Sequence, residues 1–334
     1  MNKIKWGILS TANIGKEQVI PSIQRSENGE VYAVASRGGD KAEKFADELG
    51  IPHAYSSYEE LIADTEIDAV YIPLPNKLHK EWVIKAAKQG KHVLCEKPAA
   101  LTAADLKEMF DVCEENNVIF MEAFMYQFHP QHEKVQELLS SNTIGKVGHA
   151  HASFSFVLDT DADPTNIRLN KELGGGVLYD AGCYTVHSLC NILNETPVQV
   201  YARAKQHPEF KIDTTVVGVL SFASGIEASF DTSFEAAFKQ SYQLFGKDGT
   251  VKASSPYRPD VVDDGKGVIQ VENSDGTKEH RIDGDQYKIQ AEHFANCIIE
   301  KKQPSYSKQH MMDHARVLDA CFESINTGNS VKLS

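Results

Sequence analysis

The tripeptide Glu96-Lys97-Pro98 places an acid, an amine and a proline directly after a short apolar run. Residues 93–95 read as a buried strand. A residue before proline avoids the helical region, so Lys97 is expected in an extended or turn conformation. Ligands of open α/β sheets bind beyond the carboxyl ends of the strands. An amine desolvated beside a ligand can have its pKa lowered from ~10.4 towards ~7–8, where it exchanges protons near neutral pH. A surface Lys-Pro turn is the alternative.

A second group of reactive side chains follows three consecutive glycines at residues 174–176. Asp180 and Tyr184 are expected in the first turns of a helix, where a spacing of four residues puts them on one face. Asp180 would orient the charged amine of Lys97, the amine would lower the pKa of Tyr184, and Tyr184 would reach a substrate hydroxyl. The alternative is a helix start with an acid and a core tyrosine. His187, one turn later, is interpreted as structural.

The elements expected to position Lys97 are typical of a dinucleotide-binding unit. Ile4–Leu9 is expected as a strand, residues 16–25 as a helix and residues 31–35 as the next strand. The fingerprint G-x-G-x-x-G keeps only its last glycine, yet small residues and a helix N-terminus still suit a pyrophosphate. A plain βα turn is the alternative. The cofactor contacts predicted in this turn are Ser10, Thr11, Ala12, Asn13, Ile14 and Gly15.

The end of the second expected strand indicates which dinucleotide is bound. In NAD-binding domains an acidic residue ~20 positions after the fingerprint hydrogen-bonds the ribose 2′-hydroxyl. Ser36 and Arg37 occupy that place. A hydroxyl and a guanidinium suit a 2′-phosphate, and Lys41 adds positive charge. We therefore predict NADP as the cofactor. NAD is the alternative, because Asp40 dilutes the positive field.

The α/β alternation continues through a strand at residues 69–72, which leads into Pro73-Leu-Pro-Asn76. We expect this segment to be a loop that lines the cofactor cleft, because its prolines oppose helix formation. Pro73, Leu74 and Asn76 are predicted cofactor contacts, as is His79, for which a structural role is the alternative. A helix at 103–115 and a strand at 118–121 end the alternation. We predict two domains, 1–122 for the dinucleotide and 123–334 for the substrate and for oligomerisation, with packing of the C-terminal helices back on the first domain as a variant.

The second domain contains strand-like runs without intervening helices, which predict a large, mostly antiparallel sheet in an α+β domain. The expected strands are 147–157, 198–204, 214–222, 226–232, 242–245 and 268–271. We expect a homodimer or homotetramer formed through this sheet, because such assemblies commonly cover an open sheet face. The predicted fold class is α/β, with an N-terminal Rossmann domain and this C-terminal domain.

Composition excludes several classes of protein. A chain of 334 residues with 41% hydrophobic residues can form two cores. Its net charge of −13 argues against nucleic acid or an anionic membrane as the partner. The six cysteines form no C-x-x-C pair, so we expect free thiols and no metal site. Without a leader segment or an apolar run of ~18 residues, the protein is expected to be cytoplasmic.

Several motifs together resemble the glucose–fructose oxidoreductase / inositol dehydrogenase (Gfo/Idh/MocA) family over nearly the whole chain. The similarity is strongest to NADP-dependent xylose or glucose dehydrogenases and dimeric dihydrodiol dehydrogenases. Ser10 and Ala12 depart from the fingerprint glycines of the family. The motifs that carry the resemblance are Trp6-Gly-Ile-Leu-Ser-Thr-Ala-Asn-Ile-Gly15, Pro73-Leu-Pro-Asn-Lys-Leu-His79, Glu96-Lys97-Pro98, Met121-Glu-Ala-Phe-Met-Tyr126 and Gly174–Tyr184.

The resemblance implies roles for individual residues. Lys97 would be the catalytic amine and would also contact the cofactor. Glu96 would lie near the nicotinamide and contact the cofactor as well, with Asp180 in support and Tyr184 as the acid/base. The peptide bond between residues 97 and 98 would be cis, an option specific to proline. The substrate contacts implied by the resemblance are Lys97, Tyr126, Arg168, Asp180 and Tyr184.

The predicted function is NAD(P)-dependent transfer of a hydride between the nicotinamide and a carbinol or carbonyl carbon of a sugar or cyclic diol. Oxidation of an aldose at C1 to the lactone is one example. Two alternatives remain open: a regulatory protein that binds the dinucleotide without turnover, and a reductase of a non-sugar carbonyl. Retention of Lys97, Asp180 and Tyr184 favours an enzyme, because a sensor needs no proton relay.

Overall fold

The computed structural model describes residues 3–159, 163, 165–262 and 265–333. The chain divides into two compact units, each of which includes a segment from the C-terminal part of the chain. The first unit comprises Met1–Met125 and Gln286–Met312, and the second comprises Tyr126–Asp285 and Asp313–Ser334.

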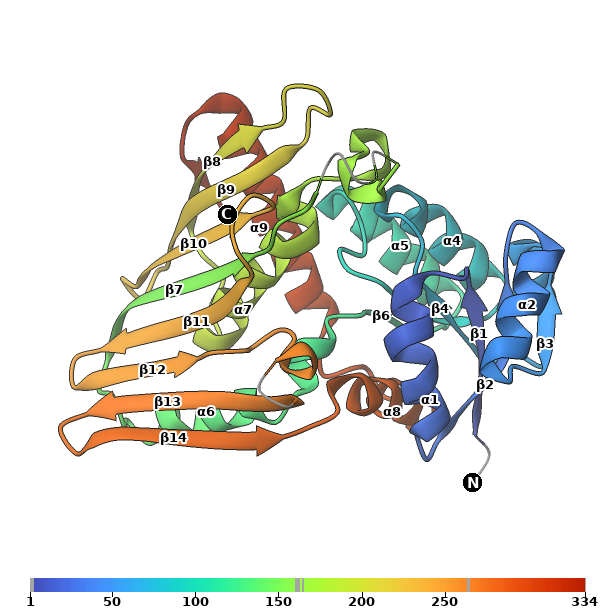
Figure 1. Cartoon of the computed structure of the whole chain (residues 1–334), viewed down its shortest axis with the longest axis horizontal. Coiled ribbons are helices and arrows are strands. Elements are labelled where there is room, and N and C mark those ends of the chain that lie inside the picture. The colour runs from blue at the N-terminus through green and yellow to red at the C-terminus, as the bar shows by residue number, and fades with distance from the viewer. Residues whose placement is uncertain (1–2, 160–162, 164, 263–264, 334) are drawn as a thin grey trace. The chain divides into compact units, whose positions relative to one another are not determined.

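The described residues of the first unit form a parallel six-stranded sheet (Figure 1). Its strand order is β3-β2-β1-β4-β5-β6, so the chain reverses direction across the sheet between β1 and β4. Ligands of open α/β sheets bind at such a switch point. The strands are β1 (Ile4–Leu9), β2 (Gly29–Ala35), β3 (His53–Tyr55), β4 (Ala69–Ile72), β5 (His92–Cys95) and β6 (Phe120–Glu122).

Local sequence signals explain where the helices of this unit begin. Thr102 caps α5 by accepting the Asp105 amide at 3.1 Å, and Ser57 caps α3 by accepting the Glu60 amide at 3.2 Å. The helices are α1 (Ile20–Arg25), which continues a π-helical turn at Gly15–Val19, α2 (Gly39–Leu49), α3 (Tyr58–Ala63), α4 (Asn76–Lys88), α5 (Ala103–Glu115) and α8 (Gln286–Glu300).

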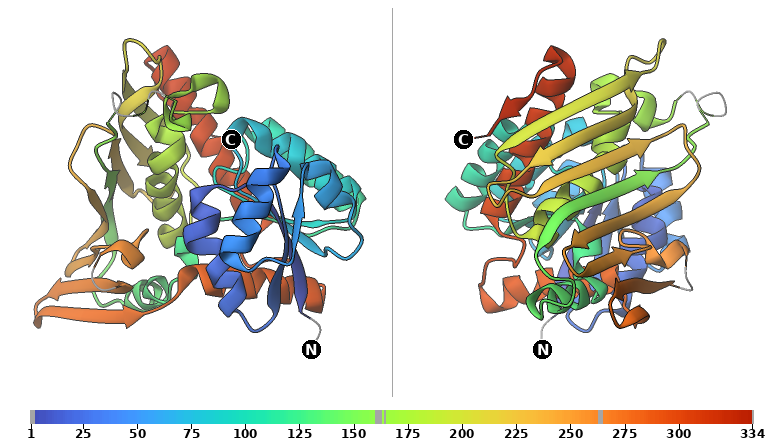
Figure 2. Two further views of the ribbon diagram at one scale, coloured as in Figure 1. Left: turned by 45° about the vertical axis from the view of Figure 1, so that its right-hand side comes forward. Right: turned by 90° about the vertical axis from the view of Figure 1, so that its left-hand side faces the viewer.

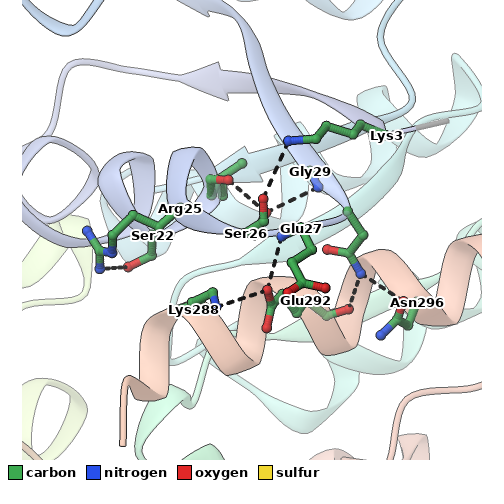
Figure 3. A network of polar contacts seen from close by, with 11 residues as sticks. Lys3, Ser22, Arg25, Ser26, Glu27, Gly29, Lys288, Glu292 and Asn296 are labelled. Carbon is green, nitrogen blue, oxygen red and sulfur yellow. Dashed lines mark hydrogen bonds and ion pairs between the residues drawn. The ribbon is translucent and has the colours of Figure 1, made fainter. Parts of the chain in front are cut away.

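Helix α8 is held to the turn between α1 and β2 (Figure 3). The Glu27 amide donates to the Glu292 carboxylate at 3.1 Å, and the Asn28 side-chain amide donates to the Glu292 carbonyl at 2.9 Å and to Asn296 at 2.8 Å. Trp6 of β1 packs against Phe294 of α8, with ring centroids 5.5 Å apart. These contacts explain why a segment distant in sequence belongs to the first unit.

The described residues of the second unit form a nine-stranded sheet, ordered β14-β13-β12-β11-β7-β10-β9-β8-β15. All neighbouring strands are antiparallel except β7 and β10, which are parallel. The strands are β7 (Val147–Ser155), β8 (Gln199–Gln206), β9 (Asp213–Ser221), β10 (Glu227–Ser233), β11 (Lys239–Gly246), β12 (Gly249–Ala253), β13 (Lys266–Asn273), β14 (Gly276–Asp283) and β15 (Val331–Lys332).

Helices cover one face of this second sheet. Helix α6 (Gln131–Ser140) packs on β13, and α7 (Cys183–Leu193) packs on β7, β10 and β11. Ser324 of α9 (Lys308–Thr327) accepts the Ala202 amide of β8 at 2.9 Å. Figure 2, right, shows the strands side by side with helices behind them. On the opposite face Tyr201, Val217 and Val219 are exposed.

The predicted fold class is confirmed, and the differences are local. Asn76 was expected in a loop, but it is the first residue of α4: the prolines end at position 75, and proline just before a helix is well tolerated. The strands β3, β12, β14 and β15 were not predicted. Within the described residues, no helix combines the length and the apolar character needed to cross a bilayer.

Candidate active site

Lys97 lies in a turn that follows β5 at the carboxyl edge of the first sheet. β4 and β5 run parallel, with Ile72 opposite Cys95. The Glu96 amide extends this ladder by donating to the Ile72 carbonyl at 3.1 Å. The peptide bond between Lys97 and Pro98 is cis, as the resemblance implied. The structure therefore places Lys97 at the edge where ligands of such sheets bind.

His79 joins the Lys97 turn to the loop after β4. The side chain is fully buried in α4, and its Nδ1 lies 2.9 Å from the Pro98 carbonyl oxygen. Its Nε2 lies 2.7 Å from the Leu74 carbonyl oxygen. Burial lowers the pKa of the imidazole. His79 thus bridges two loops that were predicted to line a cofactor cleft, which gives the side chain a structural task in the first unit.

Glu122, at the end of β6, holds the other side of the Lys97 turn. Its carboxylate accepts the Ala99 amide at 2.7 Å and the Tyr306 hydroxyl at 3.1 Å. The side chain is 3% exposed, and burial raises its pKa to about 7, against the opposing effect of these donors and of the positive charge on Lys97. A buried acid next to the turn is thereby fixed by two hydrogen bonds.

Glu96 is anchored from β4. The fully buried Tyr71 hydroxyl donates to the Glu96 carboxylate at 2.5 Å. Burial, and then the negative charge of Glu96, raise the pKa of this phenol well above its usual range. Tyr71 therefore remains protonated and acts as a hydrogen-bond donor. The Glu96 carboxylate is held next to Lys97, whose backbone amide it also accepts at 3.3 Å.

The turn after β1 has a backbone conformation that favours glycine, although serine occupies it. Ser10 has φ 122°, a conformation that favours glycine. Its hydroxyl donates to the Pro73 carbonyl at 3.2 Å and accepts the Ala12 amide at 3.3 Å. These bonds compensate for the strain of serine there. The helix that starts at Asn13 leaves amide groups at its N-terminus for an anionic ligand.

Ser36 and Arg37 follow β2, the strand next to β1. Ser36 is 7% exposed, and its amide donates to the Tyr55 carbonyl at 3.3 Å. Arg37 and Lys41 are exposed. This arrangement is compatible with a 2′-phosphate, because the two cations lie at the surface within the same short segment. The residues predicted to contact the dinucleotide in these two turns therefore all lie in the first unit.

In the second unit, the three glycines form a compressed turn before α7. A Cβ at Gly176 (φ 116°) would lie 2.3 Å from the Asp213 carboxylate, and a Cβ at Gly175 would lie 2.5 Å from the Arg168 carbonyl. The Asp213 carboxylate accepts the Leu178 amide at 2.6 Å. Only glycine allows this approach, which brings Arg168 and Asp213 to the segment that carries Asp180.

Asp180 lies in a π-helical turn at Leu178–Gly182 that runs into α7. Its carboxylate accepts the Arg168 Nε at 2.7 Å, so the structure brings two of the predicted site residues together. The negative charge of Asp180 raises the pKa of Arg168. Local π-helical turns inside longer helices are frequent at functional sites, where they shift a side chain off the regular helical face.

Tyr184 is 6% exposed and belongs to an aromatic cluster of the second unit. Its ring centroid lies 5.5 Å from those of Phe154 and Tyr257, and 5.9 Å from that of Tyr126. Tyr126 is fully buried, and its hydroxyl hydrogen-bonds His187 Nδ1. The cluster fixes the tyrosine rings, because aromatic pairs of this kind favour defined orientations.

Sequence reasoning gave no role to Tyr71, Glu122 or Asp213. Glu122 carried a signal, because it is a charged residue within an apolar segment at a strand end. Tyr71 and Asp213 carried none, because their partners are distant in sequence. Across the described residues, no group of three or more His, Cys, Asp or Glu side chains is arranged to hold a metal ion.

Comparison with known proteins gives matches along most of the chain. Residues 4–124 match the family described as "Oxidoreductase family, NAD-binding Rossmann fold", and residues 132–252 match the "GFO/IDH/MocA C-terminal domain". The chain is 40% identical to a D-xylose 1-dehydrogenase (NADP(+)) of Haloferax volcanii, with 98% of this chain and 99% of that protein covered.

Two further relatives extend the comparison. A trans-1,2-dihydrobenzene-1,2-diol dehydrogenase of Xenopus laevis is 32% identical, with 96% and 98% covered. The structure of KijD10, a 3-ketoreductase from Actinomadura kijaniata in complex with NADP and TDP-benzene, superposes with a TM-score of 0.90 at 28% identity, with 98% of each chain covered. The chain therefore belongs to the Gfo/Idh/MocA family of oxidoreductases.

Proposed function

We propose that this protein is an NADP-dependent dehydrogenase that oxidises an aldose at C1 to the lactone. The observation that carries the proposal is the Lys97 turn, fixed by His79, Glu122 and Tyr71 at the ligand-binding edge of a Rossmann sheet. The 40% identical relative named as an NADP-dependent xylose dehydrogenase supports an aldose as substrate.

The residues of the first unit fit a dinucleotide. The Ser10 turn and the helix N-terminus at Asn13 would hold the pyrophosphate, and Ser36, Arg37 and Lys41 would hold the 2′-phosphate. The remaining cofactor contacts would come from the segments after β4 and β5, namely Pro73, Leu74, Asn76, His79 and Glu96. When bound, the cofactor supplies the redox chemistry by accepting a hydride from the carbinol carbon.

The protein's own residues would handle the proton. Tyr184, as its phenolate, takes the proton of the substrate hydroxyl and becomes the neutral phenol as the carbinol becomes a carbonyl. The positive charge on Lys97 lowers the pKa of Tyr184, so that the phenolate is available. Asp180 balances the positive charge of Lys97. It also holds Arg168, which would hydrogen-bond a substrate hydroxyl. Tyr126 would contact the substrate, and its hydrogen bond to His187 fixes the position of its hydroxyl group.

Replacing Arg37 with alanine is expected to discriminate between the two dinucleotides. Loss of a charge-assisted contact to the 2′-phosphate costs ~1.5–3 kcal/mol, so KM for NADP should rise about 10- to 100-fold. KM for NAD, which lacks that phosphate, should change little. Steady-state kinetics with both cofactors measure the ratio. Lys44→Ala removes an exposed charge from α2 and serves as the control. Equal losses for NADP and NAD would contradict the assignment.

The open face of the second sheet supports assembly with a second copy of the chain. Tyr201, Val217 and Val219 form an apolar centre, because Tyr201 lies opposite Val219 across β8 and β9. Arg203 of β8 and Asp231 of β10 add charges of both signs, which a self-complementary contact can pair. We propose a homodimer or homotetramer formed through this face.

Val219→Glu should therefore lower the molar mass in solution to that of the monomer, as measured by light scattering after size exclusion. A buried, unpaired carboxylate at the centre of the contact would strongly oppose association. Val261→Glu changes a valine that is also exposed, at 53% against 39% for Val219, but lies outside the sheet, and it should leave the mass unchanged. An unaltered mass for the Val219 variant would exclude this face as the interface.

We also propose that the enzyme works in the cytoplasm. Its six cysteines are free thiols, and five of them are buried. Thiols that remain unpaired are typical of proteins kept in a reducing compartment. Net charge and composition likewise support a small-molecule substrate as the partner, rather than nucleic acid or membrane.

The proposed function is tested with a panel of aldoses, inositols and cyclic diols, each incubated with NADP or NAD and followed by absorbance of the reduced nicotinamide. Pentoses and hexoses with a free C1 hydroxyl are expected to give the highest kcat/KM with NADP. A 1-O-methyl glycoside, which cannot form the lactone, is the matched control. Activity on the glycoside equal to that on the free sugar would contradict oxidation at C1.

A further inference from the structure

A pocket of about 510 Å³ lies in the first unit, at the edge of the sheet opposite to Lys97. Its wall includes His92, the first residue of β5, and Phe120, the first residue of β6. The strands of this sheet are parallel, so their amino ends share one edge and their carboxyl ends share the other. None of the predicted cofactor or substrate residues lines the pocket, and its volume is typical of small-molecule sites.

The floor of this pocket, which we call the amino-edge pocket, is apolar. Phe110 of α5 and Phe120 are buried and meet edge to face, with ring centroids 5.0 Å apart. Cys113 is fully buried beside them. Val118 and Ile298 are partly exposed and extend the apolar wall towards solvent. A flat, apolar group could bury its surface on this floor.

The rim of the amino-edge pocket is positively charged, in contrast to a chain with net charge −13. Lys301, Lys302 and Lys308 line it, against a single acidic lining residue, Glu114. Lys308 pairs with Glu114 at 2.6 Å, and Lys302 pairs with Glu300, just outside the lining, at 2.7 Å. Lys301 forms no ion pair with any described residue. One cation is therefore left uncompensated at the mouth.

The backbone at Lys301 is unusual. Lys301 follows the last residue of α8 with φ 54°, a left-handed conformation that glycine or asparagine normally provides at a helix end. The Lys302 amide caps the helix by donating to the Cys297 carbonyl at 2.9 Å. Lys301 thus occupies a position where the backbone favours glycine, at a cost of about 1 kcal/mol in the free energy of folding. A second lysine, Lys302, follows it directly.

His92 supplies a hydrogen-bond donor from within the pocket wall. Its Nδ1 accepts the Ile119 amide at 2.8 Å, so the proton of the neutral ring lies on Nε2. Burial lowers the pKa of this histidine, which keeps the ring neutral at pH 7. Among the described residues, Nε2 has no hydrogen-bond partner. His92 is partly exposed, so this donor is open to water or to a ligand.

We propose that the amino-edge pocket binds an amphipathic organic anion. Its flat apolar body lies on Phe110 and Phe120, and its phosphate or carboxylate group pairs with Lys301 and Lys302. A polar atom of the ligand accepts the Nε2–H of His92. The proposal uses none of the residues assigned to catalysis or to the dinucleotide, so it stands or falls independently of the proposed function.

The test uses 1-anilinonaphthalene-8-sulfonate, an aryl anion whose fluorescence rises in apolar surroundings. The full-length protein is first saturated with NADP, so that the dinucleotide site is filled. One NADP-insensitive site per chain is expected. Lys301→Glu and Lys302→Glu should each raise its Kd about tenfold or more, because each loses a charged contact and adds a repulsive one.

Lys88→Glu is the matched control, because Lys88 is exposed, forms no ion pair with any residue that the structure describes and lies in the last turn of α4. It should leave the Kd unchanged. The lysines at the rim are exposed, so their replacement should not impair folding, which circular dichroism verifies. Wild-type affinity in both pocket variants, or an equal loss in the control, would overturn the proposal.

Displacement of the probe then identifies the anionic group. Both 1-naphthyl phosphate and 1-naphthoate carry the same flat body, and the better competitor indicates whether phosphate or carboxylate is preferred. Neutral 1-naphthalenemethanol should compete at least tenfold more weakly than the better anion. If the neutral compound competes equally well, the pocket does not recognise charge and the proposal is wrong.

Discussion

Lys97→Met is expected to lower kcat by about a thousandfold while leaving the Kd for NADPH within a factor of about three. General acid–base groups contribute typically ~10²–10⁴-fold to rate, and methionine keeps the length of the side chain but has no charge or proton to offer. The turn itself should persist, because His79, Glu122 and Tyr71 hold it through backbone groups or through Glu96.

The measurement combines steady-state kinetics on the best sugar of the panel with NADPH fluorescence titration. Lys88→Met makes the same chemical change at an exposed position in α4 and should retain wild-type kcat. Turnover by Lys97→Met at the wild-type rate would show that the amine takes no part in the chemistry. A lost NADPH affinity with unchanged kcat would instead make Lys97 a cofactor-binding residue.

Glu122→Gln is expected to stabilise the protein at pH 8 but not at pH 4.5 or below. The pKa of Glu122 is raised to about 7 in the folded protein, from an ordinary value of 4.5, chiefly by burial. The folded state therefore binds a proton that the unfolded chain releases between these pH values. The carboxyl group contributes stability below pH 4.5, and this contribution is lost as the pH rises through 7.

The size of the effect follows from the shift. The rise of the Glu122 pKa from 4.5 to about 7 corresponds to about 3 kcal/mol in the free energy of unfolding between pH 4.5 and pH 8. Glutamine can still accept the Ala99 amide, so the fold of the turn is kept. Urea unfolding of wild type and variant at several pH values measures the difference. Glu115→Gln, at an exposed position in α5, should show no such trend. A pH-independent difference between wild type and Glu122→Gln would contradict the assignment.

The sequence predicted those elements whose own residues contain the signal. Ile4–Leu9, Ala69–Ile72 and Ala103–Glu115 were predicted with the bounds that the structure has, because a buried apolar run or an N-capping residue marks each of them. β14 was missed, because six of its eight residues are exposed, so it lacks an apolar face that alternation could reveal. β12 is short and begins with glycine, which weakens any strand signal.

The candidate site likewise has features that could be predicted from the sequence and features that could not. Lys97 at a strand end could be located from the apolar run and the proline that flank it. The hydrogen bonds that hold its turn could not, since Glu122, His79 and Tyr306 reach it from other parts of the chain. Gly176 was noted as part of a glycine run, but the reason for it, close approach of the Asp213 carboxylate, depends on tertiary structure.

The central claim is that Lys97 and Tyr184 act on the same proton in one reaction. A double-mutant cycle in kcat with Lys97→Met, Tyr184→Phe and the double variant tests it most directly, with NADPH binding verified in each. Residues that act as a unit are not additive, so the double variant is expected to be no slower than the slower single variant. If the two losses multiply, the residues act independently and the proposed proton relay is wrong.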